Sequence, residues 1–208
     1  MPRIFGRTTA ICFKPSRLGV MTLCSLVIIG FAARAEPQQY EIDPEHLTLG
    51  FLVEHLGYAK VLGSFQEASG SYQFDEDTGQ LSDVLIVVDT ASIFTNHRRR
   101  DTHLRSADFL NVRQFPSMTF SGVTARPINE MTFEVEGELE LLGLIRPLSL
   151  TVSWNKSGAY PFGDEQYVMG ISARGSFQRS SYGMNYGVEN GWVGDTVEII
   201  IEFEARRH

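Results

Sequence analysis

The densest cluster of polar side chains that could carry out chemistry lies in the segment Asn96-His97-Arg98-Arg99-Arg100-Asp101-Thr102-His103-Leu104. His97 and Asp101 are four residues apart, so on a helix they would lie one turn apart and could form a hydrogen bond that leaves the imidazole as a base. No Ser or Cys stands at a spacing known to accompany such a pair. We therefore predict no catalytic residue, and an enzyme with His97 or His103 as its base is the alternative.

Metal binding by the same segment is disfavoured by its spacing. On a helix, His97 and His103 would point about 120° apart, which is poor geometry for one ion. Arg100, Asp101 and Arg105 are better explained as salt bridges that fix a helix at the end of the fold. The run Arg98 to Arg100 could attract an anionic ligand head or form a solvated face. The sequence therefore predicts no metal site.

Familiar catalytic signatures are absent from the whole sequence. It contains no HExxH zinc motif, no GxSxG nucleophile elbow and no Gly-rich phosphate loop. We therefore expect a protein that is not an enzyme and that has no cofactor.

The first 35 residues differ in composition from the rest of the chain. They contain five Lys and Arg residues and no acidic residue, and an apolar run extends from Val20 to Ala33. Ala33 and Ala35 supply small residues where a signal peptidase requires them. The 14-residue run is short for a bilayer span. We predict a signal peptide over residues 1–35 and a mature domain over residues 36–208, with an uncleaved membrane anchor as the alternative.

Removal of this leader changes the charge and the cysteine content. Residues 36–208 contain 13 Lys and Arg against 25 Asp and Glu, a net charge of −12. Both cysteines, Cys12 and Cys24, lie in the leader. Zinc sites built on thiolates are therefore excluded from the predicted mature domain. The net charge argues against nucleic acid and against anionic lipid headgroups as partners.

Alternation of apolar and polar residues is the dominant pattern in residues 36–208. In the clearest segment, Phe133 to Leu141, every second residue is apolar or Gly and the intervening residues are all Glu. Residues 47–55, 148–154, 167–177 and 197–204 alternate in the same way. This period of two predicts strands that are buried on one face, and we count eight or nine. The short turns between them predict an antiparallel sheet.

An all-β barrel of eight antiparallel strands best accounts for this pattern, because closure removes the sheet edges. A sandwich is the alternative. Inward-facing Gly137, Ala173 and Gly175 either leave room for a ligand or form corner kinks. The non-alternating segment from Asn96 to Asn111 predicts one short helix near a barrel mouth, with Asn96 as its N-cap.

Ten blocks of residues resemble the YceI family of exported, lipocalin-like barrels. The blocks are Tyr40 to His46, Phe51 to Gly57, Gly63 to Phe65, Ala91 to Asn96, Arg100 to Leu110, Phe115-Pro116, Thr119-Phe120, Gly137 to Leu139, Arg179 to Met184 and Gly194 to Val197. The resemblance implies an eight-stranded barrel with a helix near one mouth and an elongated apolar cavity that holds a polyisoprenoid or similar long-chain amphiphile. It also implies a periplasmic or secreted protein with no defined reaction.

From alternation and resemblance together we predict a periplasmic carrier for an isoprenoid or fatty amphiphile, a monomer or homodimer with no stable membrane span once the leader is removed. The tail is expected to lie against inward apolar side chains, with polar side chains near its head. The predicted ligand-binding residues are Phe51, Val53, His55, Phe65, Arg100, Asp101, His103, Phe120, Leu139, Leu150, Trp154, Ile171 and Phe177. The alternatives are the enzyme above and a stress-related interaction module whose barrel is filled by its own side chains.

Overall fold

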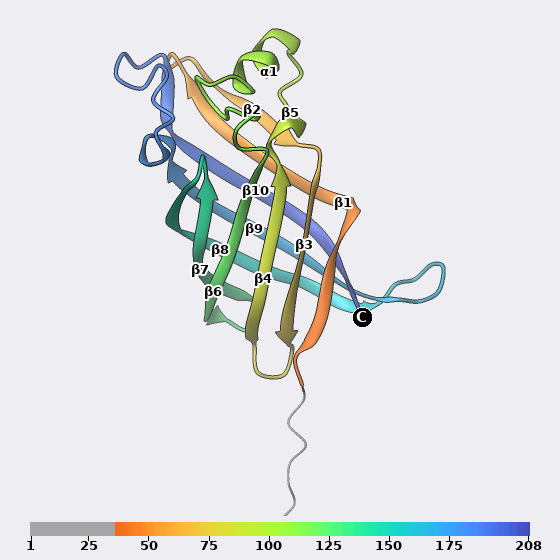
Figure 1. Ribbon diagram of the computed structural model, residues 1–208. Helices are drawn as coiled ribbons and strands as arrows, with labels where there is room; N and C mark the ends of the chain where they lie inside the picture. The colour runs from red at the N-terminus through yellow and green to blue at the C-terminus, as the bar shows by residue number, and fades with distance from the viewer. Residues whose placement is uncertain (1–35) are drawn as a thin grey trace, which may run out of the picture. The chain divides into compact units, whose positions relative to one another are not determined.

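The computed structural model describes residues 36–208, and the predicted signal peptide lies outside this range. Ten strands, one α-helix and two 3-10 helices make up the described part (Figure 1). Their bounds are β1 Gln38–His55, β2 Ala59–Phe65, β3 Ala68–Asp75, β4 Gln80–Asp89, η1 Thr90–Ser92, β5 Ile93–Phe94, α1 Arg98–Leu104, β6 Ser117–Asn129, β7 Thr132–Leu141, β8 Leu144–Ala159, β9 Tyr167–Gln178, η2 Arg179–Tyr182 and β10 Val193–Arg207.

Eight of these strands form a closed antiparallel barrel. Their order is β10-β9-β8-β7-β6-β4-β3-β1, and β1 pairs with β10 to complete the ring. The predicted all-β, eight-stranded antiparallel barrel is therefore confirmed, and the sandwich alternative is wrong. Closure leaves no free edge along the ring of eight strands, which explains how strands with such regular alternation avoid pairing with other chains.

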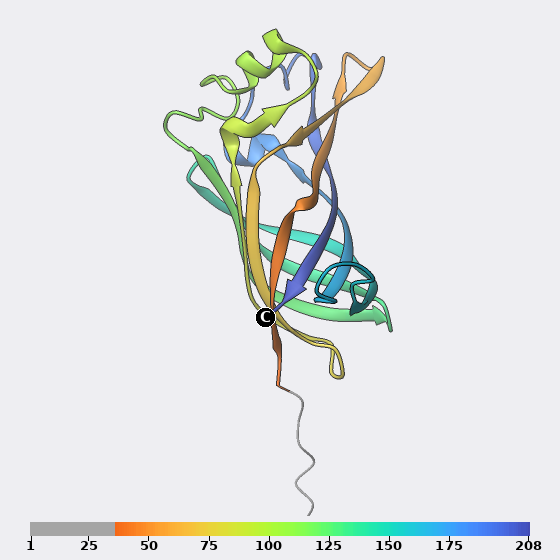
Figure 2. The same cartoon turned by 90° about the vertical axis from the view of Figure 1, so that its right-hand side faces the viewer.

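The long strand β1 links the barrel to an additional pair of strands at one end. One edge of β1 pairs with β10 from Tyr40 to His55. Its other edge pairs first with β3 over Gln38–Glu41 and then with β2 over Leu49–His55. The register shifts between Ile42 and Leu47, where a bulge bends the strand. The β1–β2 hairpin consequently extends beyond β3 at the end of the barrel that carries α1 (Figure 2).

The one α-helix is shorter than the sequence predicts. It spans Arg98–Leu104, whereas the expected helix ran from Asn96 to Asn111. The N-cap is His97, whose side chain accepts a hydrogen bond from the backbone of Arg100, and not Asn96. Asn96 has a φ of 57°, a left-handed conformation that Asn tolerates better than most residues and that lies outside helical geometry.

The interior of the barrel contains two clusters of buried apolar side chains. One lies toward the end that carries α1 and includes Phe109, Leu110, Leu141 and Tyr182. The other lies toward the opposite end. Its buried members are Tyr40, Tyr72, Phe74, Phe133, Val135, Met169, Ile171 and Ala205. Partly buried side chains such as Phe120 contact both clusters, so one continuous interior runs along the barrel axis.

Candidate functional site

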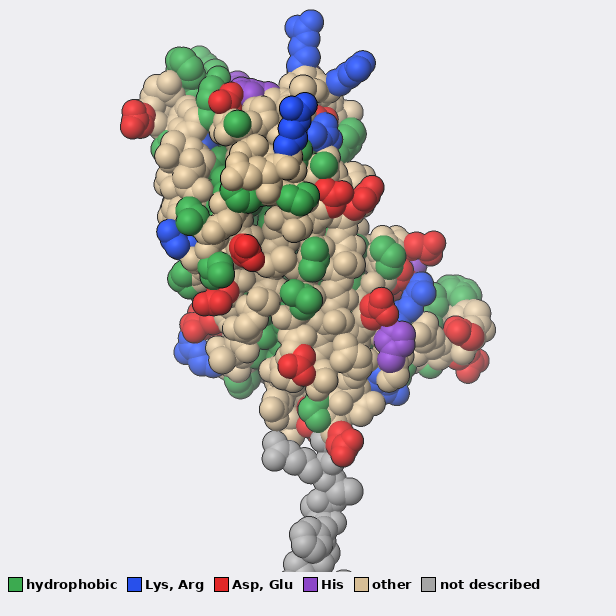
Figure 3. Space-filling view, viewed as in Figure 1, with side chains coloured by type: hydrophobic (Ala, Val, Ile, Leu, Met, Phe, Trp, Pro, Cys, Tyr) green, Lys and Arg blue, Asp and Glu red, His purple; other side chains and the backbone are tan. Residues whose placement is uncertain are grey.

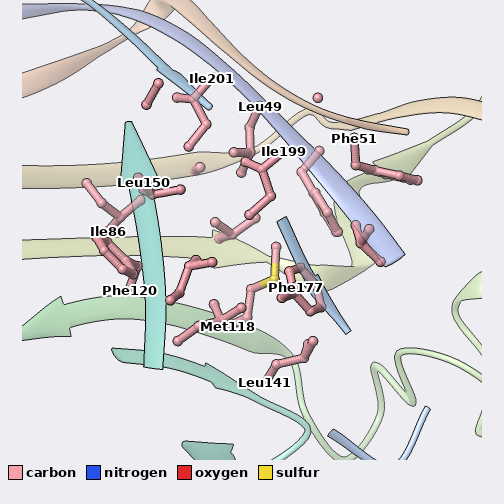
Figure 4. Close-up of a pocket in the computed structure, with 18 of the residues that line it drawn as sticks. Leu49, Phe51, Ile86, Met118, Phe120, Leu141, Leu150, Phe177, Ile199 and Ile201 are labelled. Carbon is pink, nitrogen blue, oxygen red and sulfur yellow. The ribbon is translucent and has the colours of Figure 1, made fainter. Parts of the chain in front are cut away.

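The interior holds a cavity of about 670 Å³. All ten described strands contribute side chains to its wall, and Figure 4 labels examples from β1, β4, β6, β7, β8, β9 and β10. Leu49 and Phe51 of β1, Phe120 of β6, Phe177 of β9 and Ile199 of β10 point into the same space. Ligand pockets in proteins have volumes of roughly 300–1,000 Å³ and mostly apolar walls. The barrel is therefore lined and not filled, which argues against a filled interaction module.

Two glycines in the strands let large rings lie flat against the wall. A Cβ atom added to Gly137 would lie 2.6 Å from the ring of Phe120 on the neighbouring strand. A Cβ added to Gly63 would likewise overlap the ring of Phe51. The sequence suggested that Gly137 leaves room for a ligand or forms a corner kink. Instead, the space above Gly137 is occupied by Phe120, and that ring itself forms the cavity wall.

Charged and imidazole side chains occur at one end of this cavity. Those that line it are Glu54, His55, Arg100, His103 and Arg179. They come from the end of β1, from α1 and from the start of η2, which lie together at the end of the barrel that carries α1 (Figure 1). The site thus combines an apolar interior with a polar mouth, an arrangement that suits a long amphiphile with one polar end.

Twelve of the thirteen predicted ligand-binding residues lie at the cavity wall. They are Phe51, Val53, His55, Phe65, Arg100, His103, Phe120, Leu139, Leu150, Trp154, Ile171 and Phe177. Contact between these residues and a ligand stays a prediction. The thirteenth residue, Asp101, does not line the cavity.

Asp101 has a structural role beneath the mouth. Its side chain is buried, and its Oδ1 accepts hydrogen bonds from the backbone N of Thr95 at 2.9 Å and from the Thr95 hydroxyl. The suggested hydrogen bond between His97 and Asp101 is not formed, because the Nδ1 atom of His97 accepts from the backbone of Arg100 at 3.2 Å. His97 and Asp101 therefore do not form the acid–base pair that their spacing suggested. His97 caps the start of α1, and Asp101 binds Thr95.

The arginines around α1 donate to oxygen atoms of residues 91–95, the segment before the helix. Arg100 donates from Nε to the Thr95 hydroxyl and from Nη2 to the Thr95 carbonyl, both at 2.7 Å. Arg105 donates to the carbonyls of Ala91 and Ile93. The salt bridges predicted for Arg100, Asp101 and Arg105 are therefore wrong. Backbone carbonyls that strand pairing leaves free are satisfied by guanidinium groups instead.

His103 connects α1 to the loop that follows η2. Its Nε2 lies 2.7 Å from a carboxylate oxygen of Asp108, and its ring centroid lies 5.0 Å from that of Phe109 and 4.8 Å from that of Tyr186. Both ring pairs are edge-to-face, a favourable geometry for aromatic rings. His103 therefore holds part of the mouth together as well as lining it.

Arg179 is a mouth residue that was not among the predicted site residues. Its side chain is 1% exposed and donates to the carbonyls of Met184, Tyr186, Val193 and Gly194 at 2.7–2.9 Å. Burial lowers its pKa from the ordinary arginine value, and the charge of Asp195 opposes that effect. Arg179 fixes the loop of residues 183–192, which contributes Tyr186 and Trp192 to the cavity wall. The loop has no alternation, so the sequence pattern could not place it.

The opposite end of the barrel is sealed by a hydrogen-bonded group around Glu76. Its carboxylate accepts from the hydroxyls of Tyr40 at 2.6 Å, Ser157 at 2.7 Å and Tyr167 at 3.0 Å. Tyr40 is fully buried and stacks on Tyr72 with ring centroids 5.2 Å apart. Burial and the hydrogen bond to Glu76 raise the pKa of Tyr40 above its ordinary range. This end therefore forms the floor of the cavity.

The described residues offer no arrangement suited to a metal ion. Within residues 36–208 no three His, Cys, Asp or Glu side chains come together as a metal-binding group. No helix in this part of the chain has the length and apolar character needed to cross a membrane.

The model of the YceI-like domain matches residues 40–205. A UPF0312 protein of Yersinia enterocolitica is 34% identical over 197 residues, which cover 94% of this chain and 98% of the relative. Protein YceI of Salmonella arizonae is 33% identical over 194 residues, covering 92% of this chain and 97% of the relative.

A solved structure described as a polyisoprenoid-binding domain from Saccharophagus degradans has the same fold. It superposes with a TM-score of 0.56 at 16% identity, covering 81% of this chain and 98% of that one. At this identity the likeness concerns the fold alone. The family model, in contrast, matches nearly the whole described barrel, and the family resemblance drawn from the sequence is confirmed. The chain therefore belongs to the YceI family.

Proposed function

We propose that the protein is an exported, non-enzymatic carrier for a polyisoprenoid or similar long-chain amphiphile, acting in the periplasm. The observation that supports this most directly is the 670 Å³ apolar cavity with its charged side chains confined to one end. A structural neighbour described as polyisoprenoid-binding supports the same ligand class. Each methylene group transferred from water into such a cavity contributes about 0.8 kcal/mol, less the cost of ordering the chain.

The orientation of the ligand follows from the distribution of polar groups. The tail would extend toward the floor formed by Tyr40 and Tyr72, where the wall is apolar. The head would lie near Arg100 and Arg179, whose guanidinium groups are the cationic groups of the cavity lining. A polar head placed at the floor would lose its hydration among apolar side chains, which disfavours the reverse orientation.

Lipid extraction tests the carrier function directly. The full-length chain is expressed in a bacterial host, the exported protein is purified from the periplasm, and its organic extract is examined by mass spectrometry. We expect one long-chain amphiphile in roughly stoichiometric amount. If no such lipid is extracted and added long-chain isoprenols do not bind, the carrier proposal is wrong.

A pair of adjacent substitutions shows whether the lipid occupies the cavity. Ile199→Trp adds a large side chain to the cavity wall, whereas Ile200→Trp adds the same side chain at a neighbouring position of β10 that does not line the cavity. We expect the Ile199 variant to retain much less lipid than the Ile200 variant. Equal lipid content in the two folded variants would place the lipid elsewhere.

A further inference from the structure

Three segments surround the cavity mouth. They are the β1–β2 hairpin around Leu56, the helix α1, and the loop of residues 183–192 (Figure 2). The backbone N of Leu56 donates to the carbonyl of Trp192 at 3.1 Å, which joins the hairpin to the loop. The rings of Tyr186 and His103 join the loop to α1. The loop thus joins the hairpin to α1, and the three segments together border the opening.

This border exposes large apolar side chains to solvent. Tyr58 at the tip of the hairpin is 90% exposed, Trp192 is 53% exposed and Leu56 is 46% exposed. Leu56 and Trp192 also line the cavity, so the exposed apolar surface is continuous with the interior. A contiguous apolar surface at an opening marks an interaction site more often than single exposed residues do.

The part of this border formed by α1 and the residues after it carries positive charge in an acidic domain, whereas the loop of residues 183–192 contains one acidic residue, Glu189. Residues 96–113 contain five arginines and two aspartates, a net charge of +3, although residues 36–208 together carry −12. Basic side chains project from this end of the molecule in Figure 3. Arg98 and Arg99 are exposed, and neither forms an ion pair with a carboxylate of the described residues.

Three basic residues on the strands are arranged differently. Lys60 pairs with Glu198, Arg174 pairs with Glu202, and Arg126 contacts two glutamates. Their charges are compensated within the barrel. The charges of Arg98 and Arg99 are not, so they are free to meet an anionic surface. At physiological salt the Debye length is about 8 Å, which largely screens the carboxylates at the far end of the barrel from this site.

We propose that the mouth rim, defined as Leu56, Tyr58, Arg98, Arg99 and Trp192, docks on the surface of a bilayer that contains anionic phospholipid. Tyr and Trp side chains suit the interface between headgroups and acyl chains, because one part of each ring system is apolar and the other is polar. Arginines near an anionic bilayer each strengthen binding by about fivefold. In the docked state the cavity opens toward the bilayer, and an apolar ligand could enter without crossing water.

Docking through the mouth rim would add a surface to the proposed carrier function, and it departs from the expectation drawn from net charge alone. A charge of −12 averaged over the domain disfavours anionic headgroups as partners. The mouth rim has the opposite sign and meets a surface before the acidic walls do. Docking of this kind involves interfacial contact and requires no membrane-spanning segment.

Vesicle flotation tests the docking surface. Protein exported from the full-length chain is mixed with vesicles of phosphatidylcholine alone or of an equimolar mixture of phosphatidylcholine and phosphatidylglycerol. We expect flotation with the mixed vesicles, little with the neutral ones, and a loss of binding between about 0.05 M and about 0.5 M salt. Absence of flotation, or equal flotation with both vesicles, overturns the proposal.

Two pairs of matched variants locate the contact. The double variant Arg98→Gln/Arg99→Gln should weaken binding at least tenfold. The control double variant Arg126→Gln/Lys156→Gln makes the same change in net charge on the barrel wall and should leave binding nearly unchanged. Tyr58→Ser should weaken binding several-fold, whereas Phe162→Ser removes another exposed ring, in the loop between β8 and β9, and should not. Equal losses within either pair contradict docking through the mouth rim.

Lipid content measured on the same preparations separates this proposal from the carrier function. Protein that contains extractable lipid but does not float with vesicles disproves docking and leaves carriage intact. Protein that floats through the mouth rim but contains and binds no long-chain lipid disproves carriage and supports docking. Capture of a protein partner by the rim in place of vesicles would overturn the docking proposal.

Discussion

The two ends of the barrel are held together by different interactions. At the floor, side chains pack in direct contact, and Tyr40, Met169 and Ala205 are almost completely buried. At the mouth, arginines donate to backbone carbonyls: Arg179 contacts four of them, and Arg105 contacts two.

This difference explains how one end closes while the other stays open. Direct packing brings side chains from opposite walls together and excludes space between them. The buried guanidinium group of Arg179 instead binds carbonyls of the loop of residues 183–192 and of the start of β10, so the loop is fixed without side chains filling the centre of the barrel. The floor therefore limits how deep a ligand can extend, and the mouth keeps a defined opening.

The largest expected effect comes from truncating the floor. Tyr40→Ala should lower the free energy of unfolding by about 3–5 kcal/mol, because it removes a buried ring and its hydrogen bond to Glu76. Phe51→Ala at the cavity wall should cost only about 1–2 kcal/mol, since that ring already borders empty space. Urea unfolding of lipid-free protein measures both, and equal losses would remove the distinction between floor and wall.

The next largest effect concerns the mouth. Arg179→Met should cost about 3 kcal/mol, because four carbonyls lose the hydrogen bonds from a buried guanidinium group. Amide hydrogen exchange should accelerate in residues 183–192 before it does in β3 or β10. As a control, Arg126→Met removes an exposed arginine and should change stability by less than about 1 kcal/mol. Unchanged exchange in the loop would show that Arg179 does not fix it.

A smaller, pH-dependent effect is expected for Asp43, on β1 near the floor. Its buried carboxylate accepts from His46 at 2.8 Å, Arg206 at 2.6 Å and the backbone of Glu45 at 3.0 Å. Burial alone would raise the pKa of Asp43, but these hydrogen bonds outweigh burial and lower it. Asp43→Asn should cost about 1–2 kcal/mol at neutral pH, measured by urea unfolding.

The sign of the pH dependence follows from the two linked groups. A lowered carboxyl pKa stabilises the fold above about pH 4, and that contribution is lost as pH falls through the pKa of the folded state. The hydrogen bond that His46 makes to the Asp43 carboxylate raises the pKa of His46, so its contribution is present below about pH 6.5 and is lost as pH rises through the folded-state pKa. The stability difference between wild type and Asp43→Asn should therefore shrink toward both extremes. A difference independent of pH would contradict this linkage.

The smallest effect is expected for the second His–Asp pair, at the mouth. His103 and Asp108 approach to 2.7 Å, but both side chains are substantially exposed, at 41% and 54%. Asp108→Asn should therefore lower the free energy of unfolding by less than about 0.5 kcal/mol. A loss as large as that of Asp43→Asn would show that the mouth is as tightly packed as the floor.

Local patterns in the sequence predicted much of the wall but little of the mouth. Phe51, Leu139 and Phe177 lie on alternating strands, and a period of two places such residues on one face whatever the rest of the chain does. The residues that shape the mouth follow no period. Asp101 could not be assigned to Thr95, nor Arg179 to four carbonyls, because their partners are set by loop conformations that depend on tertiary packing.

The sequence by itself determined the leader composition, the alternation that dictates strands, and the family to which the chain belongs. Tertiary structure decided that the barrel is lined and not filled, because the size of the cavity depends on whether rings from distant strands meet across it. It also placed Arg98 and Arg99, on α1, at the same end of the barrel as Tyr58 and Trp192. Net charge is a sum over the residues of the sequence, whereas the electrostatic field at a surface depends on where the charges lie in space.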